Sequence, residues 1–169
     1  SDETRVTLFG HAVAQPLYRN SSAGSTAMTT EEAVDLYHGL TDEGFQINDT
    51  LYNAYVNSPT TRSISATNFQ TGETSEWSFG EEDISFYTKE LQQSWENDYN
   101  DVAIVMLARA GGEGNELYMS DPEEGISQLA LHQQEKDLLA MIRDSGKFDK
   151  IVVLINSGNP MELGWLDEY

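Results

Sequence analysis

The stretch from Asp101 to Glu116 constrains the fold more than any other part of the chain. Its first half, Val102 to Ala108, is an unbroken apolar run without alternation, which is typical of a strand buried on both faces of a parallel sheet. Its second half is glycine-rich and holds one carboxylate, Glu113, between Gly112 and Gly114. Glycines let a backbone turn sharply and approach a ligand closely. Because open α/β sheets bind ligands at the carboxyl ends of their strands, Glu113 is the leading candidate for chemistry.

Helical and strand patterns alternate along the rest of the chain. Strands are predicted at 6–9, 45–47 and 150–155, each rich in apolar residues. Helices are predicted at about 48–56, at 84–97 and from Leu131 through Ile142 to Gly146. A further helix presents Ala33, Leu36, Tyr37 and Leu40 after a Thr29–Glu32 capping box and stops at Gly44. This order predicts one domain over 1–169, a three-layer α/β/α sandwich with a mostly parallel, flavodoxin-like sheet.

Residues 57–83 interrupt that alternation. The segment is rich in Ser, Thr, Asn and Gly, with only isolated apolar residues, among them Trp77 and Phe79. We interpret it as an insertion that holds a β-hairpin, in which 63–69 pairs with 76–79 across Thr71 and Gly72.

Charge and composition exclude several function classes. The chain has 29 acidic and 9 basic residues, a net charge of −20, which argues against nucleic acid and anionic membrane surfaces as partners. A neutral substrate such as a sugar is compatible with that charge, although excess acid also serves solubility. There is no cysteine, no apolar run near the roughly 20 residues of a membrane span, and no signal-peptide character at the start. The compartment stays open between the cytoplasm and a piece of a secreted protein.

Each candidate residue also has a structural interpretation. Glu113 is either a functional acid or a solvated acid in a surface turn. Arg109, at the end of the strand, either orients a carboxylate or a substrate hydroxyl, or pairs with a neighbouring acid for structural reasons. The histidines, His11, His38 and His132, match no metal spacing and are expected to be surface or helix residues. We therefore predict no metal ion and no cofactor.

Three familiar enzyme motifs are missing. The glycine loop lacks the G-x-G-x-x-G spacing of dinucleotide sites and the Gly-Lys-Ser/Thr end of phosphate loops, and Glu113 would repel phosphate. No serine lies in a G-x-S-x-G elbow, so a hydrolase triad has no nucleophile candidate.

The ordered segments resemble the second, α/β-sandwich domain of glycoside hydrolase family 3, the β-glucosidase-like enzymes. The family's Arg-x-Ser-Gly-Glu-Gly-x-Asp pattern after a buried strand is matched by Arg109, Gly111 (for Ser), Gly112, Glu113, Gly114 and Glu116 (for Asp). A later Asn-x-Gly-x-Pro turn with a nearby Trp is matched by Asn156, Gly158, Pro160 and Trp165. The family's first strand and following glycine loop are matched by Phe9, Gly10, Gly24 and Ser25, whereas Ser21, Ser22 and Thr26 differ.

The resemblance implies a role for each of these residues. Glu113 stands where the family has its acid/base, and Arg109, Gly112, Gly114, Gly24 and Ser25 would contribute to the sugar site. The substrate would be a β-linked glucoside or oligosaccharide. The family's nucleophile is an Asp on a separate TIM-barrel domain, and family members continue past the equivalent of Tyr169. The chain is thus expected to be part of a larger enzyme and inactive alone.

Two other interpretations keep the same architecture. One is a non-catalytic carbohydrate-binding or scaffolding module that has lost the chemistry. The other is a flavodoxin-like mononucleotide domain.

Overall fold

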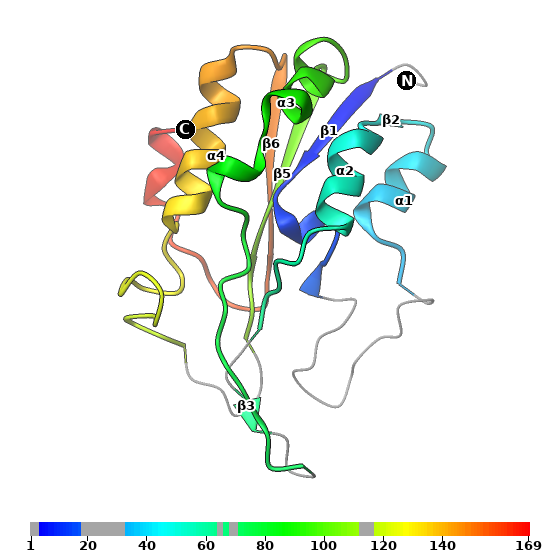
Figure 1. Cartoon of the computed structure of the whole chain (residues 1–169). Helices are drawn as coiled ribbons and strands as arrows, with labels where there is room; N and C mark the ends of the chain where they lie inside the picture. Colours follow the sequence, from blue (N-terminus) through cyan, green and yellow to red (C-terminus); the bar gives the residue numbers. More distant parts are fainter. Residues whose placement is uncertain (1–3, 18–32, 64–65, 68–70, 112–116) are drawn as a thin grey trace.

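The computed structural model describes residues 4–17, 33–63, 66–67, 71–111 and 117–169. Its centre is a four-stranded parallel sheet in the order β2-β1-β5-β6. The strands are β1 (Arg5–Phe9), β2 (Gln46–Ile47), β5 (Val102–Arg109) and β6 (Lys150–Ser157). Helices cover the sheet to give the three-layer α/β/α sandwich expected from the sequence, with α1 and α2 beside β1 and β2 and α4 beside β6 (Figure 1).

The central strand is buried as its composition requires. From Val105 to Arg109 every residue of β5 is buried, and Val105 and Leu107 are fully so. β6 pairs with β5 over eight residues but forms one edge of the sheet, so that Ile151 and Ile155 each remain 42% exposed. The apolar composition of both segments therefore predicted strands correctly. How deeply each strand is buried depends on whether it lies in the middle or at the edge of the sheet.

The helices begin and end at the residues that local chemistry selects. In α2 (Asp49–Val56) the Asn48 side chain accepts a hydrogen bond from Leu51 N, and α4 (Gln133–Ser145) ends at Gly146 with φ +59°. These two helices confirm the predicted segments. The first helix, α1 (Leu36–Asp42), is shorter than expected because Asp35 caps it and leaves Ala33 outside; the Thr29–Glu32 capping box lies outside the described residues.

The predicted continuous helix over 84–97 is wrong in one respect. The structure has a 3₁₀ turn, η3 (Ile84–Phe86), followed by α3 (Lys89–Glu96). The break arises because Tyr87 turns inward, where its hydroxyl bonds the Tyr55 hydroxyl at 2.7 Å, and the Thr88 hydroxyl then caps the new helix at Leu91 N. In the part of the chain that the structure describes, two further 3₁₀ turns are η1 (His11–Val13) and η4 (Gly164–Asp167).

A hairpin is present between 57 and 83 as expected, but its second strand lies at 74–75, before the predicted 76–79. β3 (Ala66–Thr67) pairs antiparallel with β4 (Thr74–Ser75), and a bridge joins Ser63 to Ser78. In Figure 1 the hairpin extends beyond the carboxyl ends of the parallel strands. The hairpin therefore stands at the edge of the sheet from which the glycine loop departs. The interpretation of 57–83 as an insertion stays a prediction.

Candidate functional site

Most residues of the predicted sugar site fall outside the described part of the chain. These are Gly24, Ser25, Gly112, Glu113 and Gly114. The structure describes the parts that adjoin them in the fold, namely the end of β5, the hairpin base and the segment 117–135. We call these parts the frame of the site.

Arg109, the last residue of β5, is fixed by a buried ion pair. Its Nη1 and Nη2 each lie 2.7 Å from one carboxylate oxygen of Glu135 in α4, and both residues are 1% exposed. The same two nitrogens also donate to the Ala108 and Ala130 carbonyls at 2.9 and 2.7 Å. The structural alternative for Arg109, a pair with an acid, is therefore present. Its role toward substrate stays a prediction.

Gln128 joins the two flanks of the glycine loop. Its side-chain Nε2 donates to the Ala110 carbonyl at 2.6 Å, and its Oε1 accepts from Tyr118 N at 3.2 Å. Its backbone N–H donates to the Tyr118 carbonyl at 2.8 Å, and the residue is 3% exposed. One buried amide thus holds the chain where it leaves β5 and where it returns.

Phe79 of the hairpin base lies between two basic side chains. Its ring stacks on the His132 ring with centroids 3.7 Å apart and planes at 15°, and the Arg109 guanidinium carbon lies 4.9 Å from the same centroid. Contacts between a cation and an aromatic face contribute about 0.5–2 kcal/mol. Phe79 therefore attaches the hairpin to the end of β5.

His132 is held at both ring nitrogens. Nε2 lies 3.0 Å from Asp121 Oδ2, and Nδ1 lies 3.2 Å from the Ala130 carbonyl. Burial alone would raise the pKa of Asp121, but the backbone N–H groups of Glu124 and Glu123, together with His132, hold that pKa below its ordinary value.

Arg62 also holds the base of the hairpin, through two hydrogen bonds of its guanidinium group. Its Nε and Nη2 donate to the Phe79 and Gly80 carbonyls, both at 2.9 Å. Gly80 adopts φ +73°, and a Cβ there would lie 2.5 Å from Arg62 Cβ. The close approach therefore requires glycine at position 80.

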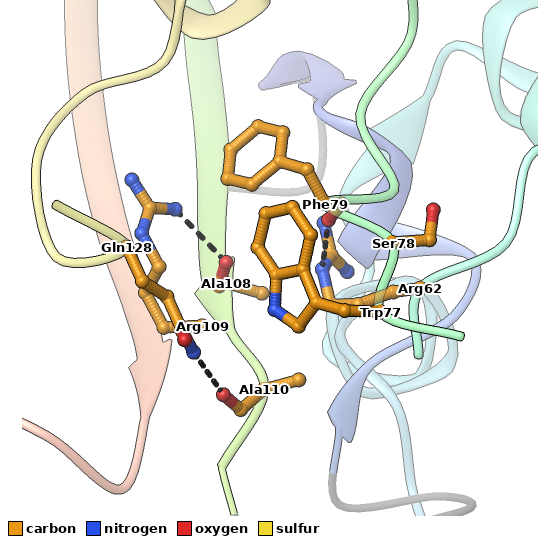
Figure 2. Close-up of a pocket in the computed structure, with 8 residues that line it drawn as sticks. All are labelled: Arg62, Trp77, Ser78, Phe79, Ala108, Arg109, Ala110 and Gln128. Carbon is orange, nitrogen blue, oxygen red and sulfur yellow. Dashed lines mark hydrogen bonds between the residues drawn. The ribbon is translucent and has the colours of Figure 1, made fainter. Parts of the chain in front are cut away.

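A small hollow lies between the hairpin base and the end of β5. It is partly open to solvent and has room for about one water molecule, and Figure 2 shows the residues that line it. The hairpin side supplies Arg62, Trp77, Ser78 and Phe79, and the opposite side supplies Ala108, Arg109, Ala110 and Gln128. The hollow is thus formed by the same residues that hold the loop and the hairpin in place.

A second buried polar cluster lies at the end of β1. The Glu81 carboxylate accepts hydrogen bonds from the backbone N–H of His11 at 2.9 and 3.2 Å and from Glu82 N at 2.9 Å. His11 Nδ1 lies 2.8 Å from Glu82 Oε1, and Gly10 N donates to the Tyr55 hydroxyl at 3.0 Å. The cluster connects the hairpin segment to the end of β1.

Burial dominates the ionisation of Glu81. It raises the pKa of the carboxyl to about 7, although Arg62 and the Glu82 and His11 backbone groups act in the opposite direction. A carboxyl that titrates near neutrality beside a candidate site is a recognised functional signal, although structural networks also produce it.

Two other residues of the glycosidase-like sequence pattern, Asn156 and Trp165, make hydrogen bonds within the fold. Asn156 Oδ1 accepts from Leu17 N at 2.9 Å, and Trp165 is buried with its Nε1 donating to the Glu162 carbonyl at 2.6 Å. A side chain at Gly111, where the family has Ser, would meet the Asn159 amide. The turn after β6 therefore lies against the start of the glycine loop.

His38 is a surface residue of a helix as expected, whereas the burial of His11 and His132 was not expected. His38 is an exposed residue of α1, and His11 belongs to η1, but His11 and His132 are both completely buried. Neither is a surface residue, because both side chains are held by carboxylates. Among the described residues no group of three or more His, Asp or Glu side chains forms a candidate metal site, and no helix there is long and apolar enough to cross a membrane.

Sequence reasoning missed several residues of this frame. Arg62, Glu81, Gln128 and Glu135 each bond a partner 17 to 70 positions away, which no local pattern reveals. One local pattern could have pointed to this frame: Trp77-x-Phe79, followed by Gly80 and the acids Glu81 and Glu82.

No protein-family profile and no curated protein sequence matches the chain. Among solved structures it is similar to a β-glucosidase from Paenibacillus barengoltzii, with a TM-score of 0.65 and 22% sequence identity. The similarity covers 96% of this chain but 16% of that chain, so this chain spans about one sixth of the length of that enzyme. At this identity the likeness establishes that the chain shares the α/β fold found in part of that β-glucosidase.

Proposed function

We propose that this chain is the α/β-sandwich part of a retaining β-glycosidase that acts on β-linked glucosides or oligosaccharides. In this proposal Glu113 is the general acid/base, and the nucleophile is an Asp on a TIM-barrel domain of the same enzyme. The observation that carries the proposal is the fold shared with a β-glucosidase over 96% of this chain. It agrees with the position of the glycine loop, whose flanks lie at the carboxyl end of the central strand.

The reaction divides between two carboxyl groups. In a retaining glycosidase one carboxylate attacks the anomeric carbon while the acid, about 5–5.5 Å away, protonates the leaving oxygen. The same group then removes a proton from the water that hydrolyses the glycosyl-enzyme. Glu113 would perform both proton transfers, and Gly112 and Gly114 would allow its carboxyl to reach a cleft completed by the other domain.

The remaining predicted residues would hold the sugar. Gly24 and Ser25 would approach it from the loop after β1, and Arg109 would act from the end of β5. The ion pair with Glu135 supports Arg109 in this role, because a guanidinium held by four hydrogen bonds presents its remaining N–H in a fixed direction.

The decisive experiment uses the complete polypeptide that contains this chain. Glu113→Gln should reduce turnover of glycosides with poor leaving groups about 10²–10⁴-fold and affect activated aryl glycosides far less, since these need no protonation. Glu113→Ala should be accelerated by azide on activated substrates and should yield a β-glycosyl azide. Glu43→Gln, which alters an exposed acid after α1, is the control.

Equal, small losses on both substrate classes and no azide effect would contradict the proposal. A chain that binds sugars but shows that result would be a carbohydrate-binding module.

A further inference from the structure

Two aromatic side chains meet where the glycine loop leaves and rejoins the frame of the site. Trp77 comes from the hairpin base, and Tyr118 lies on the flank that follows the loop. Their ring centroids are 5.7 Å apart with the planes at 65°, an edge-to-face contact. Trp77 lines the same hollow as Ala110 (Figure 2), and Tyr118 N donates to the Gln128 side chain that also binds Ala110. The pair therefore adjoins both ends of the loop.

Both side chains are open to solvent at their polar ends. Trp77 and Tyr118 are each partly exposed. Among the described residues, the Trp77 indole N–H and the Tyr118 hydroxyl make no hydrogen bond, and neither belongs to the buried polar atoms that lack a partner. Apolar neighbours extend this surface, since Leu117 is 36% and Met119 is 78% exposed. We call these four residues the aromatic patch.

The basic side chains beside the patch are bound within the protein. His132, whose ring centroid lies 6.2 Å from that of the indole, is held by Asp121. Arg109 is held by Glu135, and Arg62 donates to two backbone carbonyls. The patch therefore offers a ligand two aromatic rings with one N–H and one O–H. In a chain of net charge −20 such a surface favours a neutral ligand over an anion.

A sugar ring matches this surface. A pyranose has C–H groups on its faces and hydroxyls around its rim, so it can lie on an aromatic ring and form hydrogen bonds at its edge. Trp and Tyr supply the corresponding apolar area together with a polar end. Exposed apolar residues that cluster, in contrast to those that occur singly, mark binding sites.

The position of the patch selects the leaving-group side of the substrate. In a glycosidase the general acid protonates the leaving oxygen, so the leaving group lies next to the acid. Under the proposed function the acid is Glu113, which belongs to the loop whose ends the patch adjoins.

We propose that the aromatic patch is a subsite for the sugar on the leaving-group side of the scissile bond, with the pyranose ring stacked on Trp77 and bordered by Tyr118. The inference rests on the proposed function, which supplies the substrate, and adds that the site selects oligosaccharides over simple alkyl glucosides.

The test measures binding, not turnover, on the complete polypeptide that contains this chain. The probes are the S-linked analogues of cellobiose, laminaribiose and gentiobiose, which glycosidases do not cleave readily, and methyl β-thioglucoside, which lacks the second ring. In calorimetric titrations we expect the best of the three disaccharides to bind about tenfold more tightly than methyl β-thioglucoside. Trp77→Ala should abolish this preference and leave the affinity for methyl β-thioglucoside unchanged.

Two variants serve as controls. Trp77→Phe keeps an aromatic ring and should retain most of the preference, which separates loss of stacking from a folding defect. Leu166→Ala removes an exposed apolar side chain from η4 and should leave both affinities unchanged.

Disaccharides that bind no more tightly than methyl β-thioglucoside would overturn the subsite. A Trp77→Ala variant that keeps the preference, or that weakens both kinds of probe equally, would also overturn it. None of these outcomes depends on proton transfer by Glu113, which is tested separately by the leaving-group dependence of its variants.

Discussion

Arg109 at the end of β5 and Glu135 in the first turn of α4 form a two-point ion pair, with both N–O distances at 2.7 Å and both side chains 1% exposed. Glu135 also accepts the backbone N–H of His132 at 3.1 Å, which attaches the start of the helix to the same carboxylate. A strand end and a helix start are thereby fixed to each other at the edge of the sheet.

Removal of this carboxylate should therefore be costly. Glu135→Ala leaves a buried guanidinium without its counterion, and we expect the free energy of unfolding to fall by about 3–5 kcal/mol in urea denaturation. Asp144→Ala removes the partner of exposed Arg143 and should leave stability unchanged within error. Similar effects of the two substitutions would show that the buried pair contributes nothing special.

Gln128 should be needed both for stability and for loop position. Gln128→Ala leaves the Ala110 carbonyl and Tyr118 N–H without their partner, and should lower the free energy of unfolding by about 2–3 kcal/mol. Under the proposed function, kcat of the complete polypeptide on poor leaving groups should fall about tenfold or more, because displacement of the loop flanks would misplace Glu113. Gln93→Ala, on the exposed face of α3, is the matched control.

A normal kcat together with the expected loss of stability would mean that Gln128 serves the fold alone.

Glu81 should make stability fall as the solution becomes more alkaline. Its pKa is about 7 in the folded chain against an ordinary value of 4.5, so the folded state binds the proton more tightly. The resulting stabilisation is complete below pH 4.5 and is lost as the pH rises through about 7, a difference on the order of 3 kcal/mol. Denaturation at pH 5 and pH 8 measures it.

The Glu81→Gln variant isolates this contribution, because its side chain does not titrate. Relative to the wild type, it should gain stability at pH 8 and lose the dependence between pH 4.5 and 7. Glu43→Gln should leave that dependence intact. A Glu81→Gln variant that keeps the wild-type dependence would assign the effect to another group.

Gly10 should resist substitution more strongly than another glycine of positive φ. Gly10 has φ +90° and a Cβ there would collide with the Met106 carbonyl oxygen, whereas Gly72 has φ +73° and open space around it. Gly72→Ala should cost about 1 kcal/mol from backbone strain alone, and Gly10→Ala about 3 kcal/mol because overpacking adds to it. Thermal unfolding of both variants compares the two, and equal losses would show that β1 can move away from β5.

The parts that could be predicted from the sequence are those determined by neighbouring residues, such as apolar runs and helix caps. The run at 102–108 identified the central strand, and Asn48 and Gly146 marked helix ends, because a cap or an apolar run acts on its immediate neighbours. The break at Tyr87 could not be predicted, since it depends on the distant Tyr55 hydroxyl. For the same reason Arg109 suggested a partner acid, whereas Glu135 as that partner emerged only from the fold.

Because the amide of Gln128 secures both flanks of the glycine loop, the segment between them can vary in sequence and length without loosening the sheet. Under the proposed function, exchange of the residues around Glu113 in that segment is therefore a practical route to altered specificity. A library built between positions 110 and 118 that keeps Glu113 would sample new loop sequences on an unchanged scaffold.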